Sequence, residues 1–340
     1  MTERDDSKFD WRGRNVLVTG AGGFIGSQLV ERLMGLGAKV HAFVRYNSRN
    51  DLGFLEALKS RAVGSPTGLR ISAGDVRDLD TVRGIAEGAD TIFHLAALVG
   101  IPYSYQHVHE VVEVNVIGTL NVLTAGREKG ARRIVHASTS EVYGSALAVP
   151  IDEGHPKQPQ SPYSASKIAA DALARSHFLS FGVPVVICRP FNTYGPRQSD
   201  RAIIPTLVAQ ALASSEIQVG RLDPTRDFTF VSDTVEGFLR LAERDACLGE
   251  EINLGTGREI SIGDLAKRVL ALVGRDLPIR QAEERVRPAN SEVSRLCSNN
   301  AKAKRLAGWA PVVGLDEGLR ATIDWIRASS HLYTPGTYRI

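Results

Sequence analysis

The chain has 340 residues, of which 43% are hydrophobic and 23% are charged. This ordinary globular composition is enough for one large α/β domain or for two unequal ones. The formal charge of +3 is spread along the chain. Because no run of Lys and Arg is dense, we expect no nucleic-acid partner and no acidic membrane surface as a partner.

The remaining composition bears on location. Cys188, Cys247 and Cys297 show no pairing pattern, which is typical of a reducing compartment. Residues 1–12 are polar and mixed in charge and lack the apolar stretch of a signal peptide, so we expect them to fray. No apolar run approaches membrane-spanning length. These features together predict a cytoplasmic protein.

Short, nearly continuous apolar runs alternate with longer amphipathic stretches in the first half of the chain. Strands are predicted at 15–19, 39–44, 91–95, 133–137 and 183–188, and helices at 24–36, 109–129 and 162–181. Strands without polar alternation are covered on both faces, as in parallel sheets. The alternation predicts an α/β fold with a Rossmann-like, doubly wound parallel sheet.

Beyond about residue 190, Pro and Gly recur and helices are predicted at 202–214, 233–244 and 262–273. We expect residues 13–190 to form the dinucleotide-binding domain with the catalytic helix. Residues 191–330 should form a smaller, mostly helical part that binds substrate. The boundary is soft, because parts of the second half should return to the sheet.

A glycine-rich turn follows the first predicted strand. Gly20, Gly23 and Gly26 have the GxxGxxG spacing, with Phe24 and Ile25 opening the next helix. Glycine permits a tight turn and lets backbone N–H groups approach a pyrophosphate at a helix N-terminus. Its place between a strand and a helix predicts a dinucleotide site.

The ends of the later strands indicate which dinucleotide binds. Arg45 ends the second strand, where an acidic residue would bind the ribose of NAD; an arginine there suits the 2′-phosphate of NADP. NADP is therefore favoured, and NAD stays possible. Asp75 and Val76 follow the third strand near the expected adenine, and Leu95, Ala96 and Ala97 end the fourth, where the cofactor must pass close to the backbone.

Tyr163 and Lys167 have the spacing of a catalytic pair. Positions i and i+4 share a helix face, so the phenol and the ammonium point the same way. The ammonium favours phenolate, which makes Tyr163 a candidate base for a substrate hydroxyl while a hydride leaves carbon. Lys167 would also bind the nicotinamide ribose.

Polar residues follow the strand that ends at Ala137. Thr139 is placed to bond a sugar hydroxyl, with Ser138 and Ser140 beside it as substrate-binding candidates. Glu141 is the carboxylate of this cluster and a candidate base for a carbon-bound proton next to a ketone. His107 and His109 have no third ligand nearby in the sequence, so no metal site is predicted.

Over residues 14–330 the chain resembles the extended short-chain dehydrogenases of the nucleotide-sugar epimerase/dehydratase family. The motifs that carry the resemblance are TGAGGFIG, GDVRD, HLAA, STSEVYG, YSASK, RPFNTYGPR and RDFTFV. It implies that Tyr163 and Lys167 are the oxidising pair and that Asn192 and Arg226 contact the diphosphate or nucleotide of the substrate. Arg287 is a weaker candidate for that contact, and Arg201 is weaker still.

Within the family, dTDP-glucose 4,6-dehydratases carry Asp-Glu after the threonine, where this chain has Ser140-Glu141. The Thr-Ser-Glu triplet resembles that of GDP-mannose 4,6-dehydratases, which also carry Val-Arg after the second strand and use NADP. It also resembles the triplet of UDP-glucuronate decarboxylases. The overall likeness is strongest to nucleotide-activated N-acetylglucosamine 4,6-dehydratases of legionaminic-acid-type pathways, through IPYSY, SPYSASKIAAD and RPFNTYGPRQS.

These features favour a 4,6-dehydratase acting on a GDP- or UDP-linked hexose or N-acetylhexosamine. A 4-epimerase and a UDP-glucuronate decarboxylase are the alternatives within the family. A non-catalytic dinucleotide-binding regulator is the alternative outside it, although such a protein would be expected to lack Tyr163 or Lys167. The resemblance also implies a homodimer joined through the helices at 109–129 and 162–181.

Overall fold

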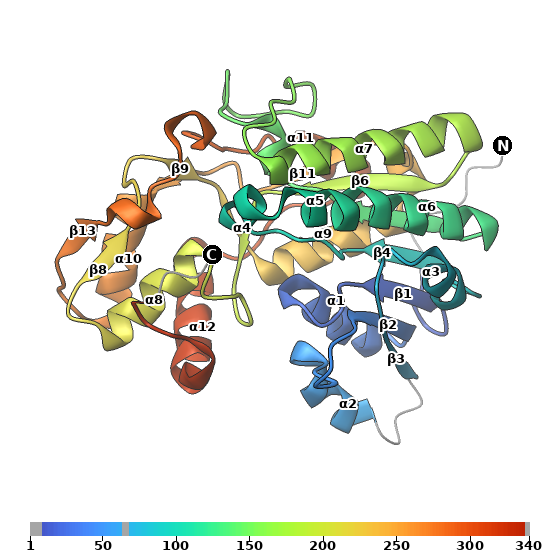
Figure 1. Cartoon of the computed structure of the whole chain (residues 1–340), viewed down its shortest axis with the longest axis horizontal. Coiled ribbons are helices and arrows are strands. Elements are labelled where there is room, and N and C mark those ends of the chain that lie inside the picture. Colours follow the sequence, from blue (N-terminus) through green and yellow to red (C-terminus); the bar gives the residue numbers. More distant parts are fainter. Residues whose placement is uncertain (1–8, 63–67, 337–340) are drawn as a thin grey trace.

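The computed structural model describes residues 9–62 and 68–336, and a parallel sheet runs through the larger part of it, on the right-hand side of the view in Figure 1. Within these residues the sheet has seven strands: β1 (Asn15–Thr19), β2 (Lys39–Arg45), β3 (Leu69–Gly74), β4 (Thr91–His94), β5 (Arg133–Ala137), β6 (Val185–Pro190) and β11 (Glu251–Leu254). This sheet confirms the predicted α/β, Rossmann-like fold.

The strand order β11-β6-β5-β4-β1-β2-β3 reverses direction between β1 and β4. Val16 of β1 pairs with Val40 of β2 on one side and with Thr91 of β4 on the other. Loops that leave the carboxyl ends of β1 and β4 therefore diverge and leave a crevice, which is the usual ligand position in such sheets.

Helices cover both faces of the sheet, as apolar strands require. The helices are α1 (Phe24–Gly35), α2 (Glu56–Ala62), α3 (Leu79–Ile85), α4 (Ile101–Gln106), α5 (Val108–Val112), α6 (Gly118–Glu128), α7 (Pro162–Phe181), α8 (Ile203–Ala213), α9 (Val231–Glu243), α10 (Ile262–Val273), α11 (Ala301–Ala307) and α12 (Leu315–Ala328). Side chains of α1 and α9 share one core with the sheet, whereas α3, α6 and α7 share the core on the other face.

Two local predictions are corrected. The helix predicted at 109–129 is divided, because a π-helical segment (Glu113–Ile117) separates α5 from α6. Residues 1–8 of the segment expected to fray lie outside the described residues, but its end is ordered. Trp11 is only 3% exposed, packs on Phe93 and donates its indole N–H to Glu243 at 2.8 Å.

The second half of the chain is mixed and not mostly helical. A separate apolar core joins α8, α10 and α12 to the short parallel pair β8 (Ile217–Val219) and β13 (Ile279–Gln281). Two further pairs are β7 (Asn192–Tyr194) with β10 (Phe228–Phe230), and β9 (Thr225–Arg226) with β12 (Ile260–Ser261). Meanwhile β11 and α9 return to the main sheet, so the second half of the chain is packed against the first.

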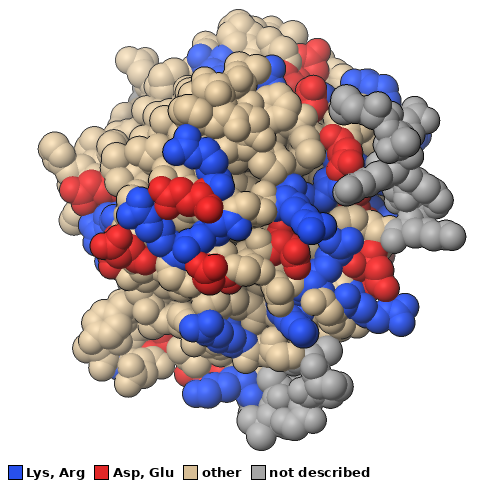
Figure 2. All heavy atoms as spheres, turned by 90° about the vertical axis from the view of Figure 1, so that its right-hand side faces the viewer, with Lys and Arg blue, Asp and Glu red and all other residues tan. Residues whose placement is uncertain are grey.

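The surface carries both signs of charge. On the face shown in Figure 2, basic and acidic side chains are interspersed. Ion pairs such as Arg83–Glu128, with N···O of 2.8 Å, occur throughout the described residues. No helix among the described residues is long and apolar enough to cross a membrane.

Candidate active site

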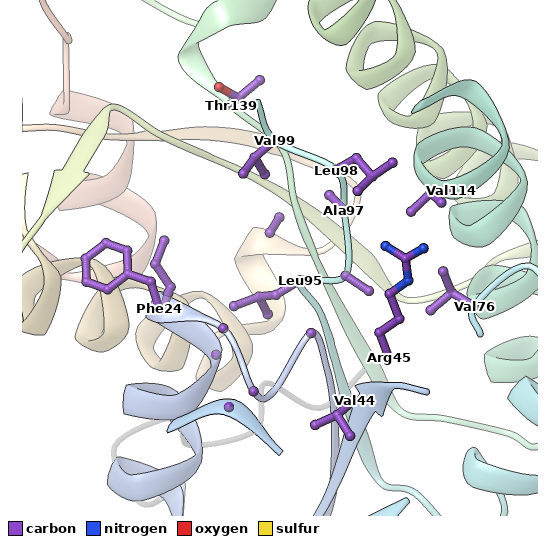
Figure 3. Close-up of a pocket in the computed structure, with 18 of the residues that line it drawn as sticks. Phe24, Val44, Arg45, Val76, Leu95, Ala97, Leu98, Val99, Val114 and Thr139 are labelled. Atoms are coloured by element: carbon purple, nitrogen blue, oxygen red, sulfur yellow. The ribbon is translucent and has the colours of Figure 1, made fainter. Parts of the chain in front are cut away.

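A cavity of about 650 Å³ lies at the carboxyl ends of the central strands (Figure 3). This volume is in the range of cofactor and small-molecule sites. Its walls include every predicted site residue apart from three arginines. The predicted residues that line it are Gly20, Gly23, Phe24, Ile25, Gly26, Arg45, Asp75, Val76, Leu95, Ala96, Ala97, Ser138, Thr139, Ser140, Glu141, Tyr163, Lys167 and Asn192. Arg201, Arg226 and Arg287 lie outside these walls.

The glycine-rich turn forms the cavity floor under α1. Gly20 has a φ of +68°, and a Cβ there would lie 2.8 Å from the backbone nitrogen of Ala96. A Cβ on Gly26 would collide with the carbonyl oxygen of Gly20. The turn therefore admits only glycine at these two positions, and the first turn of α1 points its N–H groups at the cavity, which fits a dinucleotide pyrophosphate.

Arg45 and Asp75 lie at the end of the cavity beyond this turn. Arg45 extends from the end of β2 into the space beside Val76 and Val114 (Figure 3). The side chain of Arg45 is 67% exposed. Asp75 is bound to Arg77, with an N···O distance of 2.7 Å, and this hydrogen bond lowers the pKa of the Asp75 carboxyl. Asp75 therefore meets the cavity as an ion pair and not as an unpaired acid.

Helix α7 places the predicted catalytic pair at the other end of the cavity. Ser161 caps its N-terminus by accepting from the Ser164 N–H at 3.1 Å, and Pro162 occupies the first turn, as is usual for helix starts. Tyr163 and Lys167, one turn apart, are 6% and 3% exposed. Lys167 Nζ donates to the Ala137 carbonyl at 2.7 Å, which anchors the ammonium at the end of β5.

Burial governs the protonation of this pair. It raises the pKa of the Tyr163 phenol, although a hydrogen bond with Thr139 acts in the opposite direction. It also lowers the pKa of Lys167 to about 8, while the negative charge of Asp171 opposes that shift. The two pKa values therefore move apart: burial favours the neutral phenol of Tyr163 and makes the Lys167 ammonium a stronger acid. Strongly shifted pKa values in a cavity are typical of functional sites.

Glu141 stands beside the pair with its carboxylate uncommitted. A short 3₁₀ turn, Ser140–Tyr143, follows β5 and is capped by Thr139, whose hydroxyl accepts from the Glu141 N–H at 3.2 Å. The Glu141 side chain makes no hydrogen bond or ion pair with the described residues, yet it lines the cavity. The turn thus presents Thr139 and Glu141 together, next to the buried Tyr163.

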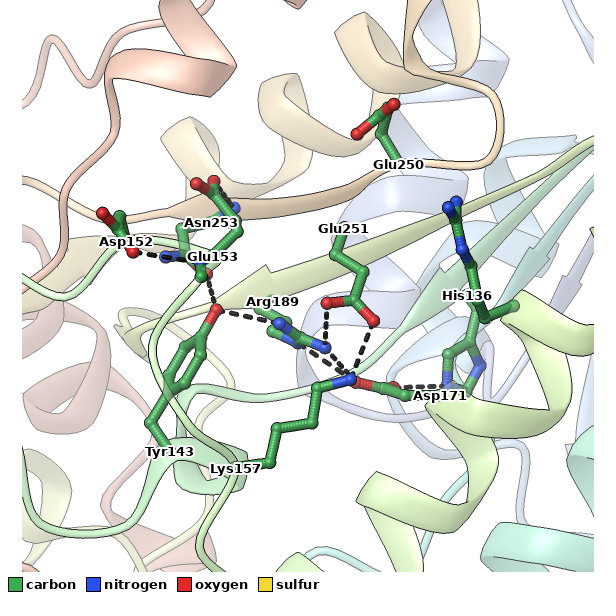
Figure 4. A network of polar contacts seen from close by, with 12 residues as sticks. His136, Tyr143, Asp152, Glu153, Lys157, Asp171, Arg189, Glu250, Glu251 and Asn253 are labelled. Atoms are coloured by element: carbon green, nitrogen blue, oxygen red, sulfur yellow. Dashed lines mark hydrogen bonds and ion pairs between the residues drawn. The ribbon is translucent and has the colours of Figure 1, made fainter.

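A buried polar network supports α7 from behind (Figure 4). Asp171, one turn beyond Lys167, is fully buried and accepts from Arg189 Nη2 at 2.9 Å; His136 Nε2 lies 3.4 Å from its other oxygen. Arg189 also reaches Tyr143 at 2.9 Å and Glu251 at 2.8 Å. Burial raises the pKa of Asp171, but its bonds with His136 and the charge of Arg189 outweigh burial and hold the pKa below its ordinary value.

The three arginines predicted to bind substrate lie outside the cavity walls. Arg226 is 6% exposed and donates to Glu292 at 3.2 Å, and Arg287 lies 3.8 Å from the same carboxylate. Burial lowers the pKa of Arg226, and the negative charges of Glu141 and Glu292 only partly offset that shift by raising it. Arg201 is exposed on the loop before α8. Arg226 and Arg287 therefore form a cluster behind Glu141, and Arg201 stands apart from it.

Comparison with known proteins connects this geometry to a family. The sequence model of the family described as "GDP-mannose 4,6 dehydratase" matches residues 17–322, which is most of the chain. The chain belongs to the nucleotide-sugar epimerase/dehydratase family. Its members are extended short-chain dehydrogenases, in agreement with the resemblance found in the motifs.

Relatives within the family carry three different reaction names. The human protein "dTDP-D-glucose 4,6-dehydratase" is 31% identical over 94% of this chain and 91% of its own length. "UDP-glucose 4-epimerase" of Mycolicibacterium smegmatis is 33% identical over 92% and 99%. "UDP-glucuronic acid decarboxylase 6" of Arabidopsis thaliana is 35% identical over 92% and 89%. Membership therefore establishes an enzyme family, and the reaction has to be argued from the site.

Solved structures of family members agree with the fold over nearly the whole chain. DesIV, a dTDP-glucose 4,6-dehydratase from Streptomyces venezuelae with NAD and TYD bound, has a TM-score of 0.84 at 29% identity and covers 94% of this chain and 98% of its own. MoeE5 in complex with UDP-glucose and NAD has a TM-score of 0.81 at 31% identity, with coverage of 93% and 99%.

Sequence reasoning missed several residues that support the site in this family member. Asn115, fully buried in the π-helical segment, binds both backbone groups of Leu98 and donates to Ser166 of α7 at 2.9 Å. Asp171, Arg189 and Glu292 were also not predicted. Asp171 could have been found from its place four residues after Lys167 on the same helix face, whereas Asn115 and Glu292 show no local signal.

Proposed function

We propose that this protein is a nucleotide-sugar 4,6-dehydratase that makes a 4-keto-6-deoxy sugar nucleotide. The observation that carries the proposal is the uncommitted carboxylate of Glu141, in the same cavity as Tyr163 and Thr139. A dehydratase must remove a proton from carbon, and a carboxylate without a partner is the group suited to that task. An epimerase needs the Tyr163–Lys167 pair but has no use for such a base.

Four polar residues of the cavity, Thr139, Glu141, Tyr163 and Lys167, are proposed to hold or move protons. NAD(P)⁺, when bound, supplies the acceptor and later the donor of the substrate hydride. Tyr163 takes the proton of the 4-hydroxyl, with Thr139 bonded to that oxygen and Lys167 stabilising the phenolate. Glu141 removes the C5 proton once a ketone at C4 has made it acidic, and it then gives that proton to the leaving 6-hydroxyl as water departs. Glu141 takes up a solvent proton and delivers it to C5 as C6 regains the hydride, which completes the 4-keto-6-deoxy sugar.

Using Glu141 as both base and acid follows from its neighbour. Ser140, 3% exposed, stands where dTDP-glucose dehydratases carry the aspartate that protonates the leaving hydroxyl. With serine there, Glu141 is the cavity carboxylate nearest to that task. This difference, together with the match to the GDP-mannose dehydratase family description, supports a GDP- or UDP-linked hexose or N-acetylhexosamine as substrate, as the likeness to legionaminic-acid-type dehydratases also does.

Asn192 and the Arg226–Arg287 cluster are proposed to hold the substrate diphosphate. Asn192 Oδ1 and Arg287 Nη1 are buried polar atoms without a hydrogen-bond partner among the described residues. Buried polar atoms are normally bonded, so these two are consistent with contacts that a substrate would complete.

The proposed cofactor is NADP, with NAD as the alternative. Arg45 is the cation at the end of the cavity away from Lys167, which suits a 2′-phosphate. Against this, the related structures DesIV and MoeE5 contain NAD. The choice is testable by extracting and identifying the dinucleotide that the purified protein retains.

We also propose a homodimer through α5, α6 and α7. Apolar side chains are exposed along this surface. Val108 and Val112 of α5 and Ile117 of the π-helical segment are 41–42% exposed, and Leu179 and Phe181 of α7 are 67% and 55% exposed. Exposed apolar side chains on adjacent helices are typical of a contact surface. Sedimentation velocity should give a dimer, and a monomer at micromolar concentration would contradict it.

The experiment that tests the reaction compares products of the wild-type enzyme and Glu141→Gln. With a panel of nucleotide sugars, mass spectrometry should show loss of water, whereas loss of carbon dioxide would indicate the decarboxylase and an unchanged mass the epimerase. In deuterated water the product should carry deuterium at C5. Glu141→Gln should still oxidise C4, so reduced-cofactor absorbance should accumulate without 6-deoxy product.

Tyr163→Phe is the matched control, because it should block the first proton transfer and give neither absorbance nor product. An epimerase would lead to the opposite pattern. In that case Glu141→Gln would turn over at nearly the wild-type rate, and C5 would keep its protium. That pair of results would overturn the dehydratase mechanism.

A further inference from the structure

Glu110 of α5 lies against the guanidinium of Arg45. Arg45 Nη2 is 3.3 Å from Glu110 Oε1, and the two side chains are 67% and 26% exposed. Among the described residues that line the cavity, the cationic side chains are Arg45 and Lys167. Lys167 lies at the end of the cavity opposite to Arg45. The cation that faces the adenosine end is therefore already shared with a carboxylate.

Arg77, the other basic side chain that acts on Asp75, is already paired. Arg77 is held between Asp75 and Glu113, at 2.7 and 2.9 Å. Asp51, an acidic residue of the cavity wall, accepts from the Gly53 N–H at 2.7 Å. A phosphate entering this end of the cavity would consequently meet Arg45 first, and with it Glu110.

Glu110 is the less mobile member of the pair. Its Oε2 accepts the Tyr103 hydroxyl at 2.5 Å, and Tyr103 is itself stacked on His107 with ring centroids 4.2 Å apart. The hydrogen bond from Tyr103, followed by the charge of Arg45, lowers the pKa of Glu110 despite the opposing effect of burial. A charged carboxylate is thus held in place, while Arg45 can change partners.

We infer that Glu110 sets the preference between NADP and NAD by competing for Arg45. This inference rests on the proposed position of the adenosine ribose beside Arg45. A 2′-phosphate has to draw the guanidinium of Arg45 away from Glu110, whereas a 2′-hydroxyl does not. Glu110 therefore weakens NADP binding selectively and leaves NAD binding as it is.

Glu110→Gln tests the inference, because the amide is nearly isosteric and removes only the charge. Titration calorimetry with NADP and NAD should give a dissociation constant for NADP about three- to tenfold lower than that of the wild type, the effect expected for an exposed pair, with NAD changed less than about twofold. An unchanged NADP constant, with Arg45→Ala still weakening NADP, would overturn the inference and leave the position of the ribose standing.

Two further variants separate contact from general charge. Glu113→Gln makes the same change on the next turn, beside Arg77, and should alter either constant less than about twofold, since exposed charges at longer range are screened. In the double variant Arg45→Ala/Glu110→Gln the gain should vanish, because the two residues act on one another. An equal gain in Glu113→Gln, or a gain that persists without Arg45, would overturn the inference. If Arg45→Ala leaves NADP binding intact, both the ribose position and the inference fail.

Discussion

The two ends of the cavity hold their charges in opposite ways. At the catalytic end Lys167 and Asp171 are 3% and 0% exposed, and Arg189, also fully buried, closes the network. At the end proposed for the adenosine, Arg45 is mostly exposed and its Nη2 lies 3.3 Å from the Glu110 carboxylate. Buried charges are costly to leave unpaired, whereas exposed pairs contribute little and exchange partners easily.

The two arrangements suit two different tasks, proton transfer at the buried end and the choice between NADP and NAD at the exposed end. Proton transfer benefits from groups that are fixed before substrate arrives, and burial among fixed partners provides that. Choice between two cofactors that differ by one phosphate needs only a modest difference in affinity, which screened charges can supply. Variants at the buried end should therefore have large effects, and variants at the exposed end small and selective ones.

The largest effect is expected at Tyr163. Tyr163→Phe removes the phenol that takes the first proton, so turnover should fall by at least the roughly 10²–10⁴-fold that such groups contribute. The dinucleotide should stay bound, because the glycine-rich turn holds it. Turnover assays and analysis of the bound dinucleotide measure both quantities, and retention of a tenth of the wild-type rate would indicate another base.

Asp171→Asn should give the next largest effect, on stability. The change removes the fully buried partner of Arg189 and leaves it only Glu251, so the loss of unfolding free energy should lie near the lower end of the about 3–5 kcal/mol expected for a broken buried pair. Denaturant unfolding followed by fluorescence measures this. Glu128→Gln is the control, because its pair with Arg83 is exposed and its loss should change the unfolding free energy far less. Equal losses in the two variants would contradict the contrast between buried and exposed pairs.

The same residue predicts a pH dependence. The folded pKa of Asp171 lies below that of the unfolded chain, so its contribution is complete above the unfolded value of about 3.9 and is lost as the pH falls through the folded value. The wild type should thus lose unfolding free energy below about pH 4 more steeply than Asp171→Asn, because the variant lacks this titration. Parallel curves would show that other carboxylates dominate.

The contrast also explains which parts could be predicted from the sequence. The turn at Gly20–Gly26 and the Tyr163–Lys167 spacing are local patterns, since each function is carried out within one turn or one helix. The central strands were predicted from continuous apolar runs, which are also local patterns within single segments. These are the features on which the structure and the sequence agree.

The remaining features depend on residues far apart in the chain. Glu292 meets Arg226 across 66 positions, and Glu110 meets Arg45 across 65. Neither contact leaves a pattern in its own segment. The short β-pairs of the second half have two or three residues each, too few for a period-2 signal, so that region was predicted as mostly helical.

At the exposed end, Arg45→Ala should weaken NADP binding by about 1.5–3 kcal/mol, the range for hydrogen bonds to a charged group, and leave NAD nearly unaffected. Competition with Glu110 and exposure to solvent place the expected value at the lower end of that range. Titration of the two dinucleotides gives the numbers. Purified protein that retains only NAD would contradict the assignment of Arg45 to a 2′-phosphate.

The smallest effect expected is that of salt, and it tests both ends at once. Raising the ionic strength from about 0.1 to 1 M shortens the Debye length from about 10 to 3 Å, so exposed charges lose most of their interaction. The ratio of NADP to NAD affinity should therefore fall by about two- to threefold, the part of the selectivity that an exposed pair supplies. The stability cost of Asp171→Asn should stay the same, because its partners are buried and are screened much less. A salt-independent affinity ratio would mean that the 2′-position lies in a buried site away from Arg45, and a salt-sensitive cost at Asp171 would mean that water reaches the network behind α7.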